Sequence, residues 1–234
     1  MKKKILFTYD FCHSKSVDFI KLCKENNIKI DLIIAAPLKK LNKPNRIFNY
    51  HKYSLTSHHP RDLAKEFNIP YFVYDHNSLE TVNLIKEFDL DLGIIAGARI
   101  LNENIIKNLS FGILNLHPGI LPQSRGLDSI LWSIHNNNQL GVSAHLINHK
   151  IDSGKLVLQK KIKPLISDSI FDLYRKIYKK QIEILPEAIR LICENKTIFK
   201  NLNGGSYHSY MSEEIQKKTI NNLKSYIANY SKII

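Results

Sequence analysis

The sequence has few cysteines and no long apolar run, and each shortage excludes a class of protein. Only three of its 234 residues are cysteines, and no two form a C-x-x-C pair. A disulfide framework and a cysteine zinc site are therefore not predicted, and a reducing, cytoplasmic setting is expected. No apolar run reaches the roughly 18 residues that a membrane helix needs. The first short run, residues 5–9, ends at Asp10, too early for a signal-peptide core.

Acidic residues are also scarce, because 34 Lys and Arg face only 21 Asp and Glu, for a formal net charge of +13. The basic excess is densest between Lys39 and Lys65, where Asp62 is the only acid. A phosphate-bearing substrate suits such a segment, with Lys52 as a candidate contact. A solvated lysine-rich surface has the same composition, so charge alone leaves the partner open.

Apolar runs alternate with amphipathic stretches through the first half of the chain. This rhythm predicts a Rossmann-like α/β fold, a mostly parallel sheet with helices on both faces. Strands are expected at residues 4–9, 30–36, 71–74, 90–98, 112–117, 142–147 and 155–162. Helices are expected between them, and a long helix, kinked or restarted at Pro186, should end the core of residues 1–195.

Residues 196–234 read as a small appendage. The run Asn203-Gly204-Gly205 separates two short β-prone segments, a pattern typical of a β-hairpin. A closing helix is expected at residues 215–227. An isolated hairpin is marginally stable, so we expect this one to build a homodimer.

The richest segment for chemistry is Asn115-Leu116-His117-Pro118, at the end of an expected strand. Residues two apart in a strand face the same side, so Asn115 and His117 should point together at the carboxyl edge of the sheet. An amide donor and a group that titrates near neutrality suit positioned polar chemistry. Asp152 falls in an Asp-Ser-Gly turn between two later strands, where a carboxylate can orient an imidazole.

Other histidines are less informative. His145 and His149 are four residues apart, which pairs two ligands on a helix but not in a strand and turn. No metal is therefore predicted.

The pattern N-x-H-P-x-x-L-P, followed by an Asp turn, resembles the folate-dependent formyltransferases over residues 1–195. The run Ala96 to Leu101 also resembles the folate-pocket segment of that family. The resemblance implies N10-formyltetrahydrofolate as the formyl donor, Asn115, His117 and Asp152 as catalytic residues, and Arg99, Ile100 and Leu101 as folate contacts.

Three acceptor classes occur in that family: glycinamide ribonucleotide, methionyl-tRNA and nucleotide-linked amino sugars. The loop Asp10 to Ser14 replaces the Gly-Ser-Asn phosphate loop of the purine-pathway enzymes. Only about 40 residues follow the core, fewer than the C-terminal domain of the tRNA enzymes has. The resemblance is thus closest to the sugar N-formyltransferases, which implies a dTDP-4-amino-4,6-dideoxyglucose type of acceptor for surface polysaccharide such as O-antigen, and no nucleic acid or membrane partner.

Tyr207 is a candidate for stacking on the base, although aromatic residues of hairpins more often pack in interfaces. A reading of another class, a catalytically inactive polyanion-binding domain, stays open beside the enzyme. The intact set of Asn115, His117 and Asp152 favours the enzyme.

Overall fold

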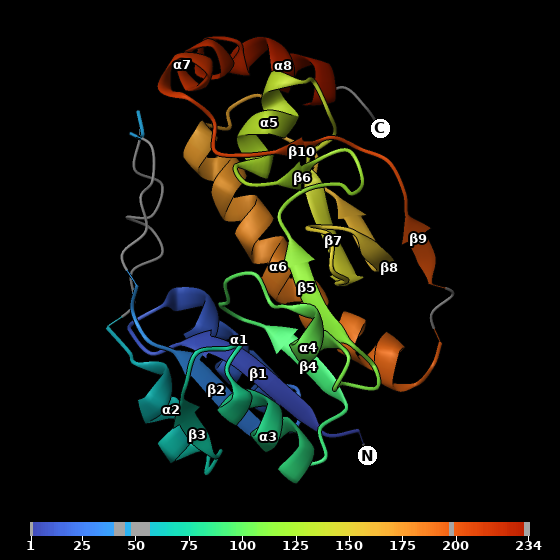
Figure 1. Ribbon diagram of the computed structural model, residues 1–234. Helices are drawn as coiled ribbons and strands as arrows, with labels where there is room; N and C mark the ends of the chain where they lie inside the picture. Colours follow the sequence, from blue (N-terminus) through green and yellow to red (C-terminus); the bar gives the residue numbers. More distant parts are fainter. Residues whose placement is uncertain (1, 40–44, 48–56, 197–198, 232–234) are drawn as a thin grey trace.

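An eight-stranded sheet runs through the molecule in the order β3-β2-β1-β4-β5-β7-β8-β9 (Figure 1). The computed structural model describes residues 2–39, 45–47, 57–196 and 199–231. The strands are β1 (Lys4–Tyr9), β2 (Leu32–Ala36), β3 (Tyr71–Val73), β4 (Leu92–Ile95), β5 (Ile113–His117), β7 (Gly141–Leu146), β8 (Gly154–Lys161) and β9 (Lys200–Leu202). The first five are parallel to one another, and the last three add antiparallel. The predicted mostly parallel α/β fold is confirmed.

Helices cover both faces of this sheet (Figure 1). They are α1 (Ser14–Glu25), α2 (Pro60–Glu66), α3 (Leu79–Glu87), α4 (Glu103–Ile106), α5 (Ser129–His135), α6 (Ile170–Cys193), α7 (Glu213–Asn221) and α8 (Leu223–Ser231). Successive side chains of β1 point to opposite faces of the sheet and so enter two separate parts of the core. Leu6 packs in a cluster with α1 and α6, whereas Ile5 and Phe7 pack with α3 and α4. In the described part of the chain, no helix has the length and hydropathy to cross a bilayer.

The long helix α6 supports the strand that carries the candidate catalytic residues. It begins with a capping box, in which Ser169 and Asp172 exchange side-chain and backbone hydrogen bonds. The helix continues through Pro186 rather than restarting there. The Gln181 side chain, buried in the core, donates to the carbonyl oxygen of Leu116, which fixes β5 on the helix.

The predicted C-terminal hairpin is wrong. β9 pairs with β8, and β10 (Tyr207–His208) pairs in parallel with β6 (Arg125–Gly126), so the two segments join different partners. Gly205 has φ of 73°, and a Cβ there would lie 1.7 Å from the carbonyl oxygen of Pro122. The glycine pair thus permits a close approach to another loop instead of a two-residue turn.

Two consequences follow for the C-terminal segment. The expected closing helix is two helices, α7 and α8. Because β9 and β10 already pair with the core, the segment does not need a second copy to satisfy its strands. The homodimer stays a prediction, without the support that an unpaired hairpin would have given it.

Candidate active site

Asn115 and His117 lie at the carboxyl end of β5, where the sheet changes from parallel to antiparallel. Asn115 is half-buried and His117 is 3% exposed. β5 pairs antiparallel with β7, and the register sets Asn115 opposite His145. Cross-strand partners share a face of the sheet, so His145 joins the pair. The amide nitrogen of Asn115 lies 3.2 Å from Nε2 of His145.

Asp152 reaches the same place from the turn between β7 and β8. Its backbone has φ of 47°, a left-handed conformation that Asp tolerates better than most residues. Its Oδ1 lies 3.4 Å from Nδ1 of His117 and 3.8 Å from Nε2 of His145. The backbone N–H of Gly126 donates to Oδ2 at 2.8 Å. The structure therefore brings together all three predicted catalytic residues.

Gly154 makes this turn possible. Its φ is 105°, and a Cβ there would meet the carbonyl oxygen of Leu146 at 2.2 Å. A glycine is required both by the backbone conformation and by the close approach. The Asp-Ser-Gly sequence thus holds the carboxylate against the two imidazoles.

His145 is the site residue that the sequence pattern did not reveal. Its ring is fully buried, and Nδ1 donates to the carbonyl oxygen of Ser153 at 3.1 Å. Burial, the larger cause, and the neighbouring His117 together lower the pKa of His145 to about 4. The ring is therefore neutral near pH 7. With its proton on Nδ1, its Nε2 accepts an N–H from Asn115.

This hydrogen bond defines what Asn115 can do. An amide nitrogen carries two N–H donors, and His145 accepts one of them. The second is available to an oxygen in the site. His145 thus orients Asn115. The alternation of side chains along β7 is the sequence signal for His145, but it places His145 beside Asn115 only once the register of β7 against β5 is known.

His117 is held at both ring nitrogens. Nε2 donates to the carbonyl oxygen of Ser124 in a short hydrogen bond, and Nδ1 faces Asp152. The Ser124 hydroxyl in turn bonds to that of Ser133 at 2.7 Å, so the loop after β5 is tied to α5. The carbonyl of Ser124 and the carboxylate of Asp152 together fix the plane of the ring.

The charge on Asp152 is stabilised inside the site. Burial alone would raise the pKa of Asp152, but His117, the Gly126 N–H and His145 together lower it. The carboxylate is therefore ionised near pH 7 although its side chain is only 12% exposed. A buried carboxylate beside an imidazole is suited to accepting and passing a proton.

Among the described residues, no hydrogen bond or ion pair joins the predicted folate contacts to this cluster. Arg99 is half-buried, Ile100 is 69% exposed, and Leu101 is buried in the core with α3 and α4. The carbonyl oxygen of Ile100 accepts from the Asn77 side chain at 2.9 Å. The segment follows β4 at the carboxyl edge, but Leu101 serves the core rather than the wall of a pocket. The folate role of the three residues stays a prediction.

Of the two residues predicted to contact the acceptor, Lys52 and Tyr207, the structure describes only Tyr207. Lys52 lies outside the described residues. Tyr207 is 47% exposed on β10, paired with Arg125. Its Cε2 would lie 2.9 Å from a Cβ on Gly126, so the ring lies over the glycine whose N–H binds Asp152. In the described part of the chain, no group of three or more metal-ligating side chains is placed to hold a metal ion.

The part of the chain that carries this cluster matches a known protein family. Residues 23–189 match the family described as "Formyl transferase". The chain is 29% identical over 198 residues to a phosphoribosylglycinamide formyltransferase of Haemophilus influenzae, covering 82% of each protein. It is 27% identical over 219 residues to a methionyl-tRNA formyltransferase of Prochlorococcus marinus, covering 92% of this chain but 64% of that protein. It is 29% identical over 144 residues to a GDP-perosamine N-formyltransferase of Brucella melitensis, covering 61% of this chain and 56% of the relative.

Solved structures have the same fold. A sugar N-formyltransferase from Shewanella superposes with a TM-score of 0.63 at 20% identity, over 88% of this chain and 76% of that one. A formyltransferase from Anoxybacillus kamchatkensis, solved with UDP-4,6-dideoxy-4-formamido-L-AltNAc and tetrahydrofolate, superposes with a TM-score of 0.58 at 19% identity, over 98% of this chain and 100% of that one. The chain belongs to the formyl transferase family, whose members are folate-dependent N-formyltransferases that use N10-formyltetrahydrofolate.

Proposed function

We propose that this chain transfers the formyl group of N10-formyltetrahydrofolate to the amino group of a nucleotide-linked amino deoxysugar. The observation that carries formyl transfer is the cluster of Asn115, His117, His145 and Asp152. Attack of an amine on a formyl carbon places negative charge on the formyl oxygen and positive charge on the amine nitrogen. Fixed donors at the first and a carboxylate near the second lower the barrier.

The residues divide these tasks. The second N–H of Asn115 is directed to the formyl oxygen, and His117, held between the Ser124 carbonyl oxygen and Asp152, orients the carboxylate. Asp152 receives the amine proton, through water, and passes it to the departing folate nitrogen. The chemistry is balanced because the proton lost by the acceptor is the one gained by N10.

The acceptor class rests on the surroundings of Asp152. Tyr207 presents an exposed ring over Gly126, where a flat base can stack. The loop after β1 carries Phe11 stacked on Tyr9, with ring centroids 5.0 Å apart, in place of a Gly-Ser-Asn phosphate loop. The sugar N-formyltransferases among the similar proteins support the same class. Our first choice is dTDP-4-amino-4,6-dideoxyglucose, as used for O-antigen.

The test is a panel of acceptors with N10-formyltetrahydrofolate, in which release of tetrahydrofolate is measured. We expect turnover of a dTDP-linked amino sugar, inhibition by dTDP stronger than by UDP or GDP, and a KM that changes modestly with salt. A tRNA acceptor would show a steep salt dependence because many phosphates are neutralised together. Efficient formylation of methionyl-tRNA or glycinamide ribonucleotide, with no amino sugar nucleotide turned over, would replace our proposal.

A binding measurement tests the donor separately. A stable folate such as 5-formyltetrahydrofolate should stabilise the protein by about 2.7 kcal/mol at a hundred times its Kd. No shift of the melting temperature at millimolar folate would contradict the assignment of the donor.

A further inference from the structure

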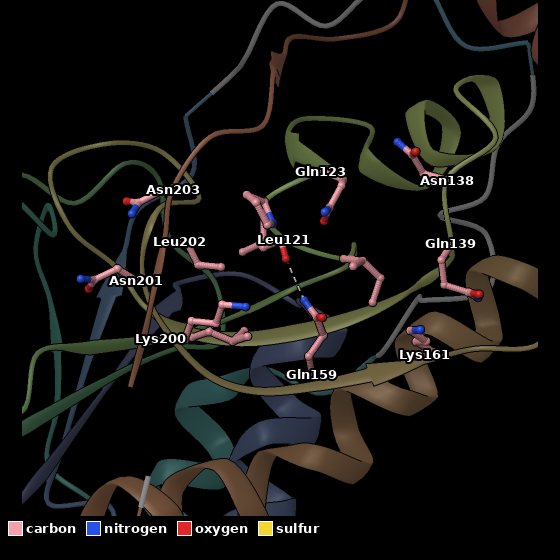
Figure 2. Close-up of a pocket in the computed structure, with 13 residues that line it drawn as sticks. Leu121, Gln123, Asn138, Gln139, Gln159, Lys161, Lys200, Asn201, Leu202 and Asn203 are labelled. Atoms are coloured by element: carbon pink, nitrogen blue, oxygen red, sulfur yellow. Dashed lines mark hydrogen bonds between the residues drawn. The ribbon is translucent and has the colours of Figure 1, made fainter. Parts of the chain in front are cut away.

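A pocket of about 740 Å³ opens between the loop after β5 and the strands β8 and β9. Figure 2 shows its lining, with Leu121 and Gln123 on the loop, Gln159 and Lys161 on β8, and Lys200 on β9. None of the four side chains of the catalytic cluster lines it. The volume is within the range of small-molecule sites, about 300–1,000 Å³. It is therefore a separate site of ligand size.

The lining has an unusual chemical balance. Six carboxamides face or rim the pocket: Gln123, Asn138, Gln139, Gln159, Asn201 and Asn203. Two ammonium groups, Lys161 and Lys200, accompany them, and no Asp or Glu does. Carboxamides offer both donors and acceptors, as hydroxyl groups require. The lysines add positive charge that nothing in the lining offsets.

Neither lysine forms a salt bridge within the described part of the chain, whereas the adjacent Lys160 lies 3.8 Å from Glu187. Lys161 follows Gln159 by two residues on β8, so both point to one face. Lys200 enters from β9, where it is the register partner of Leu156. The two positive charges thus approach one pocket from adjacent strands.

The wall of the pocket is held in place before any ligand arrives. The Gln159 amide nitrogen donates to the carbonyl oxygen of Leu121 at 3.0 Å and to the Ser143 hydroxyl at 2.8 Å. Ile120 packs closely on Gly141, since a Cβ at Gly141 would lie 2.3 Å from Cδ1 of Ile120. A preformed wall of this kind reduces the ordering cost of binding.

We propose that this pocket binds a phosphorylated saccharide. The lysines account for the phosphate, the carboxamides for the hydroxyl groups, and the side chains of Leu121, Leu156 and Leu202 for the apolar face of a pyranose ring. A neutral sugar leaves both ammonium groups unused. The proposal is independent of the acceptor assigned to the catalytic cluster.

The test is calorimetric titration of the intact chain with α-D-glucose 1-phosphate and glucose 6-phosphate, beside glucose and inorganic phosphate. We expect at least one sugar phosphate to bind about tenfold or more tightly than glucose or phosphate. The double variant Lys161→Gln/Lys200→Gln should lose about tenfold or more in affinity, because each lysine contributes a charge-assisted contact. The matched control is Lys163→Gln/Lys179→Gln, which removes two exposed lysines outside the lining and should bind as the parent does.

Three outcomes would overturn the proposal. The first is no binding of either sugar phosphate, and the second is equal binding of inorganic phosphate. The third is unchanged affinity in the Lys161/Lys200 variant, which would place the ligand elsewhere, such as at the catalytic cluster. Circular dichroism of both double variants confirms folding, which is expected because all four lysines are exposed.

Discussion

Replacing His145 by Phe keeps an aromatic ring at a fully buried position but removes the two ring nitrogens and the hydrogen bond that each of them makes. The substitution leaves the carbonyl oxygen of Ser153 and one N–H of Asn115 without partners. Each unsatisfied buried group costs about 1–3 kcal/mol, so we expect a loss of about 2–4 kcal/mol in the free energy of unfolding at pH 7.5. His149→Phe, on the exposed turn, is the matched control and should change stability by less than about 0.5 kcal/mol. Urea titration monitored by circular dichroism measures both.

The same variant tests the protonation state of His145. Its pKa falls from 6.5 in the unfolded chain to about 4 in the folded protein. As pH falls below 6.5, the unfolded state takes up the proton first, so stability is lost progressively down to about pH 4. Two to three pKa units amount to about 3 kcal/mol. The variant has no group there to titrate, and its stability should be flatter across this window.

Acidic transitions of distant groups are common to both proteins and cancel in the difference, and the transition of Asp152, whose pKa is lowered in the folded protein, lies below this window. The stability gap between parent and variant should therefore narrow on acidification. If parent and variant lost the same free energy of unfolding between pH 6.5 and pH 4, His145 would not be the buried neutral ring described above. The tautomer assigned to it would then be wrong.

Activity gives a second measurement on His145. Without an acceptor for its first N–H, the Asn115 amide is no longer fixed toward the formyl oxygen. Loss of one such donor reduces kcat by about 10²–10³-fold. His145→Gln keeps an acceptor oxygen and should recover part of that loss, whereas His149→Phe should match the parent. Full activity of His145→Phe would refute the orienting role.

Three further substitutions test other parts of the site. Asp152→Asn should fold, because an amide oxygen still accepts the Gly126 N–H, but kcat should fall about 10²-fold or more in the tetrahydrofolate-release assay since the proton acceptor is lost. Gly154→Ala should destabilise the protein by about 2 kcal/mol or more, because Ala disfavours positive φ and its Cβ meets the Leu146 carbonyl; a smaller change in urea titration would contradict the strain. Tyr207→Ala should raise the acceptor KM about tenfold by loss of stacking and leave the folate KM unchanged; an unchanged acceptor KM would remove the tyrosine from that site.

The local sequence pattern was sufficient to predict the site residues whose positions depend on a single strand or a single turn. Asn115 and His117 share a face because they are two apart, and Asp152 is fixed by a turn that its own Ser and Gly define. His145 lies beyond such reasoning, because its place depends on the antiparallel register of β7 against β5. β7 also packs on α6 and pairs with β8, so its register belongs to the tertiary structure and no short segment encodes it.

The C-terminal error has the same origin. Asn203-Gly204-Gly205 is a strong local signal for a hairpin, but the flanking segments pair with β8 and β6 and not with each other. Gly205 shows why the signal misled: its missing side chain makes room for the Pro122 carbonyl. A glycine needed for a close tertiary approach is indistinguishable in sequence from one needed for a turn.

The loop after β5 bonds to both the catalytic cluster and the C-terminal segment. Its Ser124 carbonyl holds His117, and its Gly126 N–H holds Asp152. Tyr207 and His208 of the C-terminal segment pair with the same loop. A change in the C-terminal segment therefore reaches the catalytic carboxylate through Gly126 and through Arg125, whose guanidinium donates to the carbonyl oxygens of Gly204 and Ile151. For this reason we expect acceptor specificity to be set mainly by β10, while Asn115 and His145, which bond to each other across β5 and β7, keep the formyl transfer step constant.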